Sequence, residues 1–388
     1  MQNGGTDWWP MFHHDLTHLG YSTSTAPKTN QTLWNYTTTD KVDYSSPAVA
    51  NGIVYIGSND AKVYAINATT GSLVWNYTTL GEAILSSPAV ANGVVYIGAS
   101  DSNVYALNAS TGAKVWNYTT TGYDVQSSPT IAANVVYIGC DSGEIYALNA
   151  ATGAKLWNFT TGAAVYSSPA MYGGLVYVGS DDHKIYALNA STGMKKWTYT
   201  TNNNVFSSPA VANGMIFVGS EDRSVYALNA TTGTKVWNYV TGSIVDSSPA
   251  IVNNVVYVGS NDGNVYALNE TTGTKVWNYT VGSAVASSPA VADNLVYVGV
   301  ENMKIYAFNA SAGTLEWSFK TGGLLESSPA VANGIVYVGS EDYRVYAFGQ
   351  VPAVPEFVFY LILPLFTVAT LGITLVVKRK QINIGLNP

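Results

Sequence analysis

Residues 225–242 read VYALNATTGTKVWNYVTG, and close variants of this string recur along the chain. Aligning the chain with itself on Ser-Ser-Pro places the proline at steps of 40 or 41 residues, at Pro47, Pro88, Pro129, Pro169, Pro209, Pro249, Pro289 and Pro329. A tryptophan ladder has the same spacing and comprises Trp34, Trp75, Trp116, Trp157, Trp197, Trp237, Trp277 and Trp317. Because a period of this length indicates a repeat architecture, the repeat must be interpreted before domains are counted.

Each repeat contains four short stretches with strand composition, as in SSPAVANG, IVYIGSND, KVYAINATTG and SLVWNYTT. The alternation in Val-Tyr-Ala-Leu and Val-Trp-Asn-Tyr has the period of two that sends successive side chains to opposite faces of a strand. Asn-Gly and the glycine of Asn-Ala-Thr-Thr-Gly supply the positive φ of tight turns. Four strands in about 40 residues predict one blade of a β-propeller.

The two ends of the ladders predict how the ring closes. The strand LWNYT at residues 33–37 precedes the first Ser-Ser-Pro, whereas the last repeat stops after RVYAFG without a tryptophan strand. We therefore expect the N-terminal strand to complete the eighth blade, which hides the edges that an open array would expose. The predicted fold class is all-β: one closed propeller of eight four-stranded blades over residues 31–349. An N-terminal leader, residues 1–30, is expected to pack on the ring.

The composition restricts the class of partner. Charged residues make up 11% of the 388 residues, the net charge is -7 and the pI is near 5.0. Without a basic patch the chain has no footprint for phosphate backbones, so we expect no nucleic-acid partner. The single cysteine, Cys140, excludes an intrachain disulfide.

The tryptophans of the ladder are predicted to be structural docking residues. A large ring at the same point of every outer strand can pack against the neighbouring blade. Burial of about 150 to 250 Å² per ring at about 25 cal/mol/Å² would contribute at most about 4 to 6 kcal/mol. Eight such contacts would fix the angle between blades.

The motif Tyr-Ala-Leu-Asn-Ala-x-Thr-Gly-x-x-x-Trp resembles the tryptophan-docking repeat of the pyrroloquinoline quinone (PQQ) propeller family, which usually has Asp where this chain has Asn. The leader DWWPMFHHDLTHLGYS, starting at residue 7, is similar to the segment that often precedes such propellers. The resemblance implies the fold more strongly than a function. Its members include quinoprotein dehydrogenases, an outer-membrane assembly lipoprotein of Gram-negative bacteria and surface proteins without a known reaction.

Chemistry in a propeller is expected where the blades differ. The residue before Ser-Ser-Pro varies and should approach the mouth of the central channel: Tyr44, Leu85, Gln126, Tyr166, Phe206, Asp246, Ala286 and Glu326. Candidate ligand-binding residues among them are Tyr44, Gln126, Tyr166, Phe206, Asp246 and Glu326. The alternative is that these side chains only cap a water-filled tunnel.

Two other groups of polar residues were considered as sites. Acids in the second hairpin should lie on the same face, where they could form turns or attract cations: Asp60, Asp101, Asp141, Asp182, Asp222, Asp262, Glu301 and Asp342. In HHDLTH, residues 13–18, the histidines and Asp15 could bind zinc or form a polar plug packed against the ring. No stretch has the spacing of a calcium loop, so we predict no metal site.

Catalysis is not expected. The resemblance implies that a quinoprotein dehydrogenase would add long loops between blades, calcium ligands, a catalytic Asp and often adjacent cysteines. Here the blades are joined by minimal turns and adjacent cysteines are absent. We predict a non-catalytic cell-surface propeller that acts as a binding or scaffold module, with no catalytic residue and no cofactor. The alternatives are a PQQ-dependent, calcium-containing quinoprotein dehydrogenase-like enzyme and a purely structural envelope glycoprotein.

Residues 357–377 form an uncharged run of 21 residues, about 31 Å as a helix, which predicts a transmembrane helix after a short linker at residues 350–356. The basic residues that open the tail, 378–388, predict that this end is cytoplasmic and the propeller extracellular, anchored to the cytoplasmic membrane. The sequence VPEF at residues 354–357 resembles the PEF-type C-terminal sorting signal of archaeal surface proteins, in which the helix is removed. Expected partners are the membrane and an unknown envelope protein or glycan.

Asn-x-Ser/Thr sequons are frequent, which predicts glycosylation in an exported protein. The alternative is that asparagine is there to form the turn. Candidate glycosylation sites are Asn67, Asn76, Asn108, Asn117, Asn158, Asn189, Asn229, Asn269, Asn278 and Asn309, and the sequon also occurs at Asn30 and Asn35.

Overall fold

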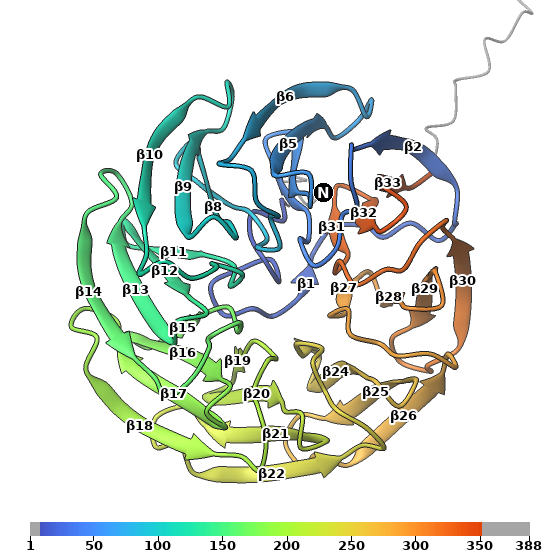
Figure 1. The fold of residues 1–388 in the computed structure, drawn as a ribbon. Helices are drawn as coiled ribbons and strands as arrows, with labels where there is room; N and C mark the ends of the chain where they lie inside the picture. Colours follow the sequence, from blue (N-terminus) through green and yellow to red (C-terminus); the bar gives the residue numbers. More distant parts are fainter. Residues whose placement is uncertain (1–7, 351–388) are drawn as a thin grey trace, which may run out of the picture. The chain divides into compact units, whose positions relative to one another are not determined.

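The computed structural model describes residues 8–350, which form 33 β-strands in eight sheets arranged around a central channel (Figure 1). The predicted all-β propeller of eight four-stranded blades is confirmed. Within residues 8–350 no helix has the length and apolar character that a membrane span requires. The predicted transmembrane helix, the basic tail and the PEF-like segment lie outside the described residues.

Four of the blades are built from consecutive strands in the first half of the ring. Blade 1 consists of β3 (Ala48–Ala50), β4 (Ile53–Gly57), β5 (Lys62–Asn67) and β6 (Leu73–Thr78). Blade 2 consists of β7 (Ala89–Ala91), β8 (Val94–Gly98), β9 (Asn103–Asn108) and β10 (Lys114–Thr119). Blade 3 consists of β11 (Thr130–Ala132), β12 (Val135–Gly139), β13 (Glu144–Asn149) and β14 (Lys155–Thr160). Blade 4 consists of β15 (Ala170–Tyr172), β16 (Leu175–Ser180), β17 (Lys184–Asn189) and β18 (Lys195–Thr200).

The second half of the ring repeats this pattern until the last blade. Blade 5 consists of β19 (Ala210–Ala212), β20 (Met215–Gly219), β21 (Ser224–Asn229) and β22 (Lys235–Val240). Blade 6 consists of β23 (Ala250–Val252), β24 (Val255–Ser260), β25 (Asn264–Asn269) and β26 (Lys275–Thr280). Blade 7 consists of β27 (Ala290–Ala292), β28 (Leu295–Val300), β29 (Lys304–Asn309) and β30 (Leu315–Lys320). Blade 8 has only β31 (Ala330–Ala332), β32 (Ile335–Ser340) and β33 (Arg344–Phe348) from this end of the chain.

The N-terminal strand supplies the missing fourth strand of blade 8, as predicted. Strand β2 (Thr32–Thr37) pairs antiparallel with β33, with Trp34 opposite Ala347 and Thr37 opposite Arg344. The ring is therefore closed by a pairing between residues about 310 positions apart, and blade 8 has four strands like the others.

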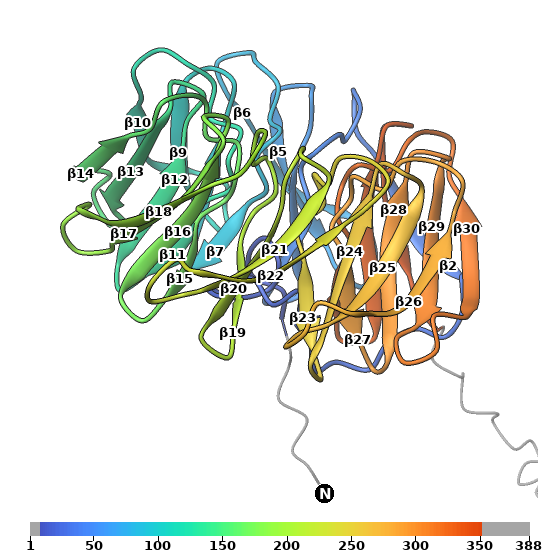
Figure 2. The same cartoon turned by 90° about the horizontal axis from the view of Figure 1, so that it is seen from below.

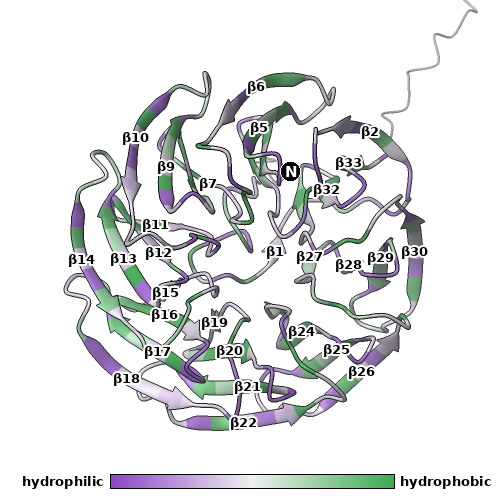
Figure 3. Ribbon diagram, viewed as in Figure 1, coloured by the Kyte–Doolittle hydropathy of each residue, from purple (hydrophilic) through white to green (hydrophobic). Residues whose placement is uncertain are grey.

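The strands run between two faces of the ring, as the side view shows (Figure 2). The mouth face carries the Ser-Ser-Pro segments and the loops between the second and third strands, such as residues 58–61. The turn face carries the Asn-Gly turns, such as Asn51 and Gly52 with φ of 52° and 77°, and the turns at the end of each third strand. The outermost strands alternate hydrophobic and hydrophilic residues, which matches their half-buried position (Figure 3).

Each ladder tryptophan lies against the turn of the next blade. The indole Nε1 of Trp75, for example, donates to the carbonyl oxygen of Ala109 at 2.9 Å, and a Cβ added to Gly112 would lie 2.7 Å from the indole ring. Glycine is thus required there both for its positive φ of 71° and for the close approach of the ring. The last contact differs, because Trp317 donates to Pro27 of the leader, which stands in for the turn of blade 8.

In seven blades a second donor reaches the same carbonyl. The hydroxyl of Tyr55 donates to the carbonyl of Ala109 at 3.0 Å, alongside Trp75. Blade 5 has Phe217 at this position, so the carbonyl of Glu270 accepts from Trp237 without a tyrosine beside it.

The two serines of each Ser-Ser-Pro have separate roles. The first serine accepts a hydrogen bond within its own blade, as when Ser45 Oγ accepts from the backbone N–H of Gly57 at 2.9 Å. In two blades its hydroxyl also donates to the next blade, from Ser127 to Ser167 O and from Ser207 to Ser247 O. The second serine joins blades, as when Ser87 Oγ accepts from the N–H of Ser46 at 2.9 Å. The inter-blade bonds form a closed circle around the channel through Ser46, Ser87, Ser128, Ser168, Ser208, Ser248, Ser288 and Ser328, each 2.8 to 3.0 Å long.

The leader crosses the channel and contacts every blade. Its backbone carbonyls accept from the middle residue of the first strand in six blades, in the pairs Trp9–Val49, Pro10–Val90, Leu16–Met171, Thr17–Val211, Leu19–Ile251 and Gly20–Val291. His18 Nε2 lies 3.2 Å from Thr130 Oγ1 of blade 3, and Ser24 Oγ accepts from Gly334 N of blade 8. Strand β1 (Tyr21–Ser22) then pairs parallel with β27. These bonds satisfy the innermost N–H groups that would otherwise line an open channel.

The contrast between blades 2 and 5 gives a stability prediction. Trp237→Phe leaves the buried carbonyl of Glu270 with neither donor, whereas Trp116→Phe leaves the carbonyl of Ala150 with the hydroxyl of Tyr96. An unsatisfied buried acceptor costs roughly 1 to 3 kcal/mol, so Trp237→Phe should lower the free energy of unfolding by about 1 kcal/mol more than Trp116→Phe. Urea denaturation measures the difference. Equal losses in the free energy of unfolding would show that the hydrogen bond from the indole does not contribute to stability.

Candidate ligand-binding site at the channel mouth

A cavity of about 270 Å³ lies at the mouth of the channel. All six predicted site residues line it: Tyr44, Gln126, Tyr166, Phe206, Asp246 and Glu326. They come from six different blades and share one position, the residue before Ser-Ser-Pro, four residues before the innermost strand. The structure thus brings these residues together, and binding of a ligand by them stays a prediction.

One wall of the cavity is aromatic. The ring centroids of Tyr166 and Phe206 lie 5.1 Å apart at an interplanar angle of 29°, so the two rings are stacked. Tyr44 of blade 1 reaches across the channel to Phe206 of blade 5, with centroids 6.5 Å apart. Phe12 of the leader also lines the cavity, so the leader closes the channel beneath it.

The acidic wall follows next to the aromatic rings and extends from blade 5 to blade 8. The carboxyl groups of Glu221, Asp246, Glu301 and Glu326 line the cavity, and its lining within the described chain contains no Lys, Arg or His. Burial, followed by the charge of Glu221, raises the pKa of Asp246 to about 6. Burial and a hydrogen bond with Asp43 raise the pKa of Glu326 to about 7. The acidic wall therefore holds carboxylates whose charge is poorly solvated.

The mouth has more hydrogen-bond acceptors than donors. Six buried acceptor oxygens in this region have no hydrogen-bond partner among residues 8–350: Oδ1 of Asp43, Asn59, Asp141, Asp181, Asp246 and Asn261. Asp43 is only 7% exposed. Burial raises the pKa of Asp141 to about 7 and that of Asp181 to about 6. Buried polar atoms normally find partners, so a concentration of unpaired acceptors at one place is unusual.

Sequence reasoning missed several residues of the site. Glu221, Asn261 and Glu301 also line the cavity. Each lies two residues after the glycine near the end of the second strand, and the residue type at this position differs between blades. Phe12 could not be aligned with any repeat. Asp43 was also missed. An insertion in blade 1 could have indicated it, because two residues lie between Val42 and Ser45 but only one lies between Ile84 and Ser86 in blade 2.

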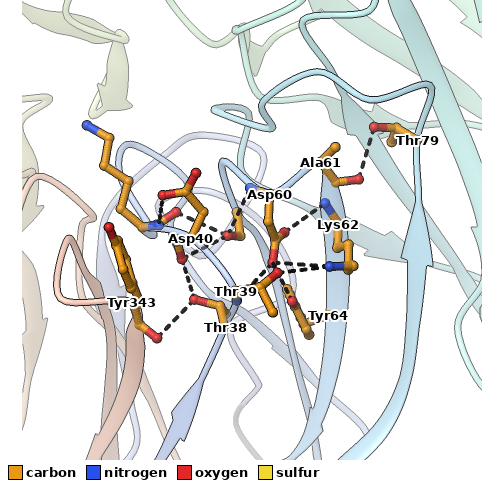
Figure 4. A network of polar contacts seen from close by, with 11 residues as sticks. Thr38, Thr39, Asp40, Asp60, Ala61, Lys62, Tyr64, Thr79 and Tyr343 are labelled. Carbon is orange, nitrogen blue, oxygen red and sulfur yellow. Dashed lines mark hydrogen bonds and ion pairs between the residues drawn. The ribbon is translucent and has the colours of Figure 1, made fainter.

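The eight acids lie on the mouth face, as predicted, but they occupy two different positions in the loop. Asp60, Asp101, Asp182, Asp222, Asp262 and Asp342 each accept a hydrogen bond from a tyrosine of their own blade. Asp60 shows the arrangement: its Oδ2 also accepts from the N–H and hydroxyl of Thr39 in the preceding loop, and Lys62 lies beside it (Figure 4). Asp141 and Glu301 occupy the neighbouring, channel-facing position. Alignment by residue type had merged two positions with different neighbours.

The histidines of the leader lie inside the channel. His13 and His18 are buried, at 2% and 0% exposure; His18 Nδ1 lies 3.2 Å from the carbonyl of Pro209. Burial and the neighbouring His18 lower the pKa of His13 to about 3, and burial lowers that of His18 to about 4. Among residues 8–350, the three potential ligand groups that come together are Asp43, Glu326 and Glu341, not the histidines of the leader.

The asparagines of the sequons occupy two environments. At the turn, Asn67 Oδ1 accepts from the N–H groups of Thr69 and Thr70. Asn149 is not part of a sequon but makes the same two hydrogen bonds, so the turn accounts for asparagine at this position. The asparagines that follow the outer-strand tryptophan are exposed: Asn35, Asn76, Asn117, Asn158 and Asn278. Occupancy by sugar stays a prediction at both.

The raised pKa of Glu326 predicts a pH-dependent effect of Glu326→Gln. Between about pH 4.5 and pH 7 the folded chain holds a proton on Glu326 that the unfolded chain releases, and above pH 7 the folded chain bears a poorly solvated carboxylate. The substitution should therefore raise the free energy of unfolding at pH 8 more than at pH 5, by on the order of 1 kcal/mol after solvent screening. Glu82→Gln, at an exposed acid, is the control. An equal effect of Glu326→Gln at both pH values would contradict the assignment.

Comparison with known proteins gives one family. A family model described as outer membrane protein assembly factor BamB matches residues 23–168, 141–288 and 261–353. A sequence comparison with curated proteins gives no match.

Several solved structures have the same fold. BamB from Moraxella catarrhalis is 21% identical, with a TM-score of 0.72 over 82% of this chain and 99% of that one. The computationally designed protein Ika8 is 18% identical, with a TM-score of 0.74 over 82% and 100%. A quinohemoprotein alcohol dehydrogenase from Comamonas testosteroni is 16% identical, with a TM-score of 0.77 over 89% and 81%. At these identities the likeness shows the fold alone.

Proposed function

Because this chain belongs to the family described as outer membrane protein assembly factor BamB, we propose that it is a non-catalytic binding or scaffold module whose recognition site is the channel mouth. The family match and the structural neighbours are compatible with both a binding protein and an enzyme. The choice between them rests on the residues of the cavity.

The proposal rests on the difference between the recurring and the variable positions of the repeat. Residues that recur in every blade, such as the ladder tryptophan and the serine pair, are used to join strands and blades. The residues that differ between blades converge on one cavity with an aromatic wall and an acidic wall. A concave site with a few convergent polar groups is the usual form of a binding pocket.

The cavity does not fit pyrroloquinoline quinone. This cofactor carries carboxylates of its own, and the described lining offers it acidic groups and no cationic side chain. Bringing like charges together in a partly buried site is unfavourable. The volume of about 270 Å³ is also at the small end of the range for small-molecule pockets, roughly 300 to 1,000 Å³. We therefore derive no oxidation step for this chain.

We also propose that the propeller stands on the outer face of the membrane, with residues 357–377 as its anchor. The ring would then be accessible to an envelope protein or glycan.

A comparison of partner capture tests the binding function. The full-length chain, purified in a mild detergent, is used to capture partners from an envelope extract in parallel with the double variant Asp246→Ala, Glu326→Ala. We expect a partner that the wild type retains and the double variant loses, because both carboxyl groups line the cavity. Capture that is identical for the two proteins, both shown to be folded by their melting curves, would exclude the mouth as the recognition site.

Removal of residues 351–388 tests the anchor. The truncated chain should fractionate with soluble protein, since the blades of residues 8–350 close on themselves without the removed segment. Fractionation after alkaline carbonate extraction measures this. A truncated chain that stays in the membrane fraction, or fails to fold, would contradict the anchored-ring arrangement.

A further inference from the structure

We propose that the channel mouth binds an organic cation, an aliphatic ammonium or guanidinium group, between its aromatic and acidic walls. The inference rests on the proposed function, because it names the chemistry of the ligand for the same cavity. Three observations support it: the excess of hydrogen-bond acceptors at the mouth, the aromatic wall and the position of Lys41.

The balance of hydrogen-bonding groups requires a ligand that donates. Asp246 Oδ2 accepts from Asn261 at 3.2 Å, but Asp246 Oδ1 and Asn261 Oδ1 are buried and have no partner among residues 8–350. Asp43 Oδ1, buried beside the rim, has the same deficit. An ammonium group has three donors and no acceptor, and a guanidinium group has five, so either one complements this set.

The aromatic wall distinguishes an organic cation from a metal ion. The stacked rings of Tyr166 and Phe206 line the cavity next to the acids Glu221 and Asp246. A cation held near an aromatic face gains from the ring quadrupole, and an alkyl chain gains from the apolar contact. A metal ion seeks oxygen ligands on all sides, and Phe206 supplies none.

The protein itself places an ammonium group at the rim. Lys41 Nζ lies 2.7 Å from Asp43 Oδ2 and 3.4 Å from Glu341 Oε1. It thus already compensates part of the carboxyl cluster formed by Asp43, Glu326 and Glu341, which could otherwise suit a metal ion. The acidic wall deeper in the cavity, with Asp246 and Glu301, has no such compensation from the lining residues.

The size of the cavity limits the ligand. A volume of about 270 Å³ accommodates one alkylammonium or alkylguanidinium group, whether as a free amine or as the end of a lysine or arginine side chain. The two sources share the same chemistry at the site and differ only in what lies outside the mouth.

Calorimetric titration of the full-length chain in non-ionic detergent at pH 8 tests the inference. The probes are 1,4-diaminobutane, N-butylguanidine, the neutral analogue 1,4-butanediol, calcium chloride, and the peptides Gly-Gly-Lys-Gly-Gly and Gly-Gly-norleucine-Gly-Gly. We expect the two cations to bind and the diol and norleucine peptide not to bind. Binding of the lysine peptide at least as tight as that of the diamine assigns the cation to a partner chain, and diamine binding alone assigns it to a small amine. Either outcome supports the inference.

Three variants locate the binding. Asp246→Asn should weaken binding of the diamine about tenfold, because a charged acceptor becomes a neutral amide of the same shape. Phe206→Leu should weaken it about threefold to tenfold through loss of the π face. Glu82→Gln removes an exposed charge from the same face and should change the affinity less than about twofold. Melting curves verify that each variant is folded.

Several results would overturn the inference. These are binding of the diol as tight as that of the diamine, binding of calcium without any binding of the amines, or equal affinities in Asp246→Asn, Phe206→Leu and Glu82→Gln. Failure of the inference is distinguishable from failure of the proposed function. If no amine binds but the double variant loses its partner, only the ligand chemistry is wrong. If amines bind but the wild type and the double variant capture the same partners, only the proposed function is wrong.

Discussion

The docking of each blade on the next is the interaction on which the whole ring depends. At seven of the eight interfaces an indole lies on a turn glycine of the following blade and donates to a turn carbonyl. At the eighth interface Trp317 donates instead to the carbonyl of Pro27 in the leader. Because eight interfaces must together complete one circle, an altered angle at any of them would have to be absorbed by the others. This constraint holds the docking residues nearly constant from blade to blade.

The same constraint leaves chemistry to the residues that do not dock. The serine circle joins the eight blades around the channel, and the residue just before each serine pair lines the mouth. The leader then turns an open tunnel into a cavity with a floor, because it bonds to the innermost strands and places Phe12 beneath the mouth. An asymmetric site is thus built on a symmetric frame by one segment that is not part of the repeat.

Much of this arrangement could be predicted from the sequence, and the remainder could not for identifiable reasons. The period of the repeat and the missing last tryptophan strand specify eight blades and their closure by β2, because strand pairing follows directly from the pattern. The variable residue before Ser-Ser-Pro was found by comparing blades. The course of the leader was not predictable, since it has no counterpart in the repeat. The contact between Tyr44 and Phe206 depends on the diameter of the channel, which no local pattern encodes.

The acids illustrate how far residue type alone can mislead. Asp60 and Asp141 both follow a second strand, but a shift of one residue along the loop separates a carboxylate bound to Tyr64 and Thr39 from one that faces the channel. The former stabilises the joint between blades, and the latter accepts from Gln126 through Oδ2 and has no partner for Oδ1 among residues 8–350. Only the three-dimensional position tells the structural acids from those available to a ligand.

The most direct test of the channel mouth as the recognition site is a crystal structure of the chain grown with 1,4-diaminobutane. We expect one ammonium group within hydrogen-bonding distance of Asp246 and the alkyl chain against Phe206, between the two walls of the cavity. An ordered diamine bound elsewhere, for example in the groove between blades 6 and 7 lined by Tyr21, Tyr257 and Asp293, with the mouth free of it, would contradict this account.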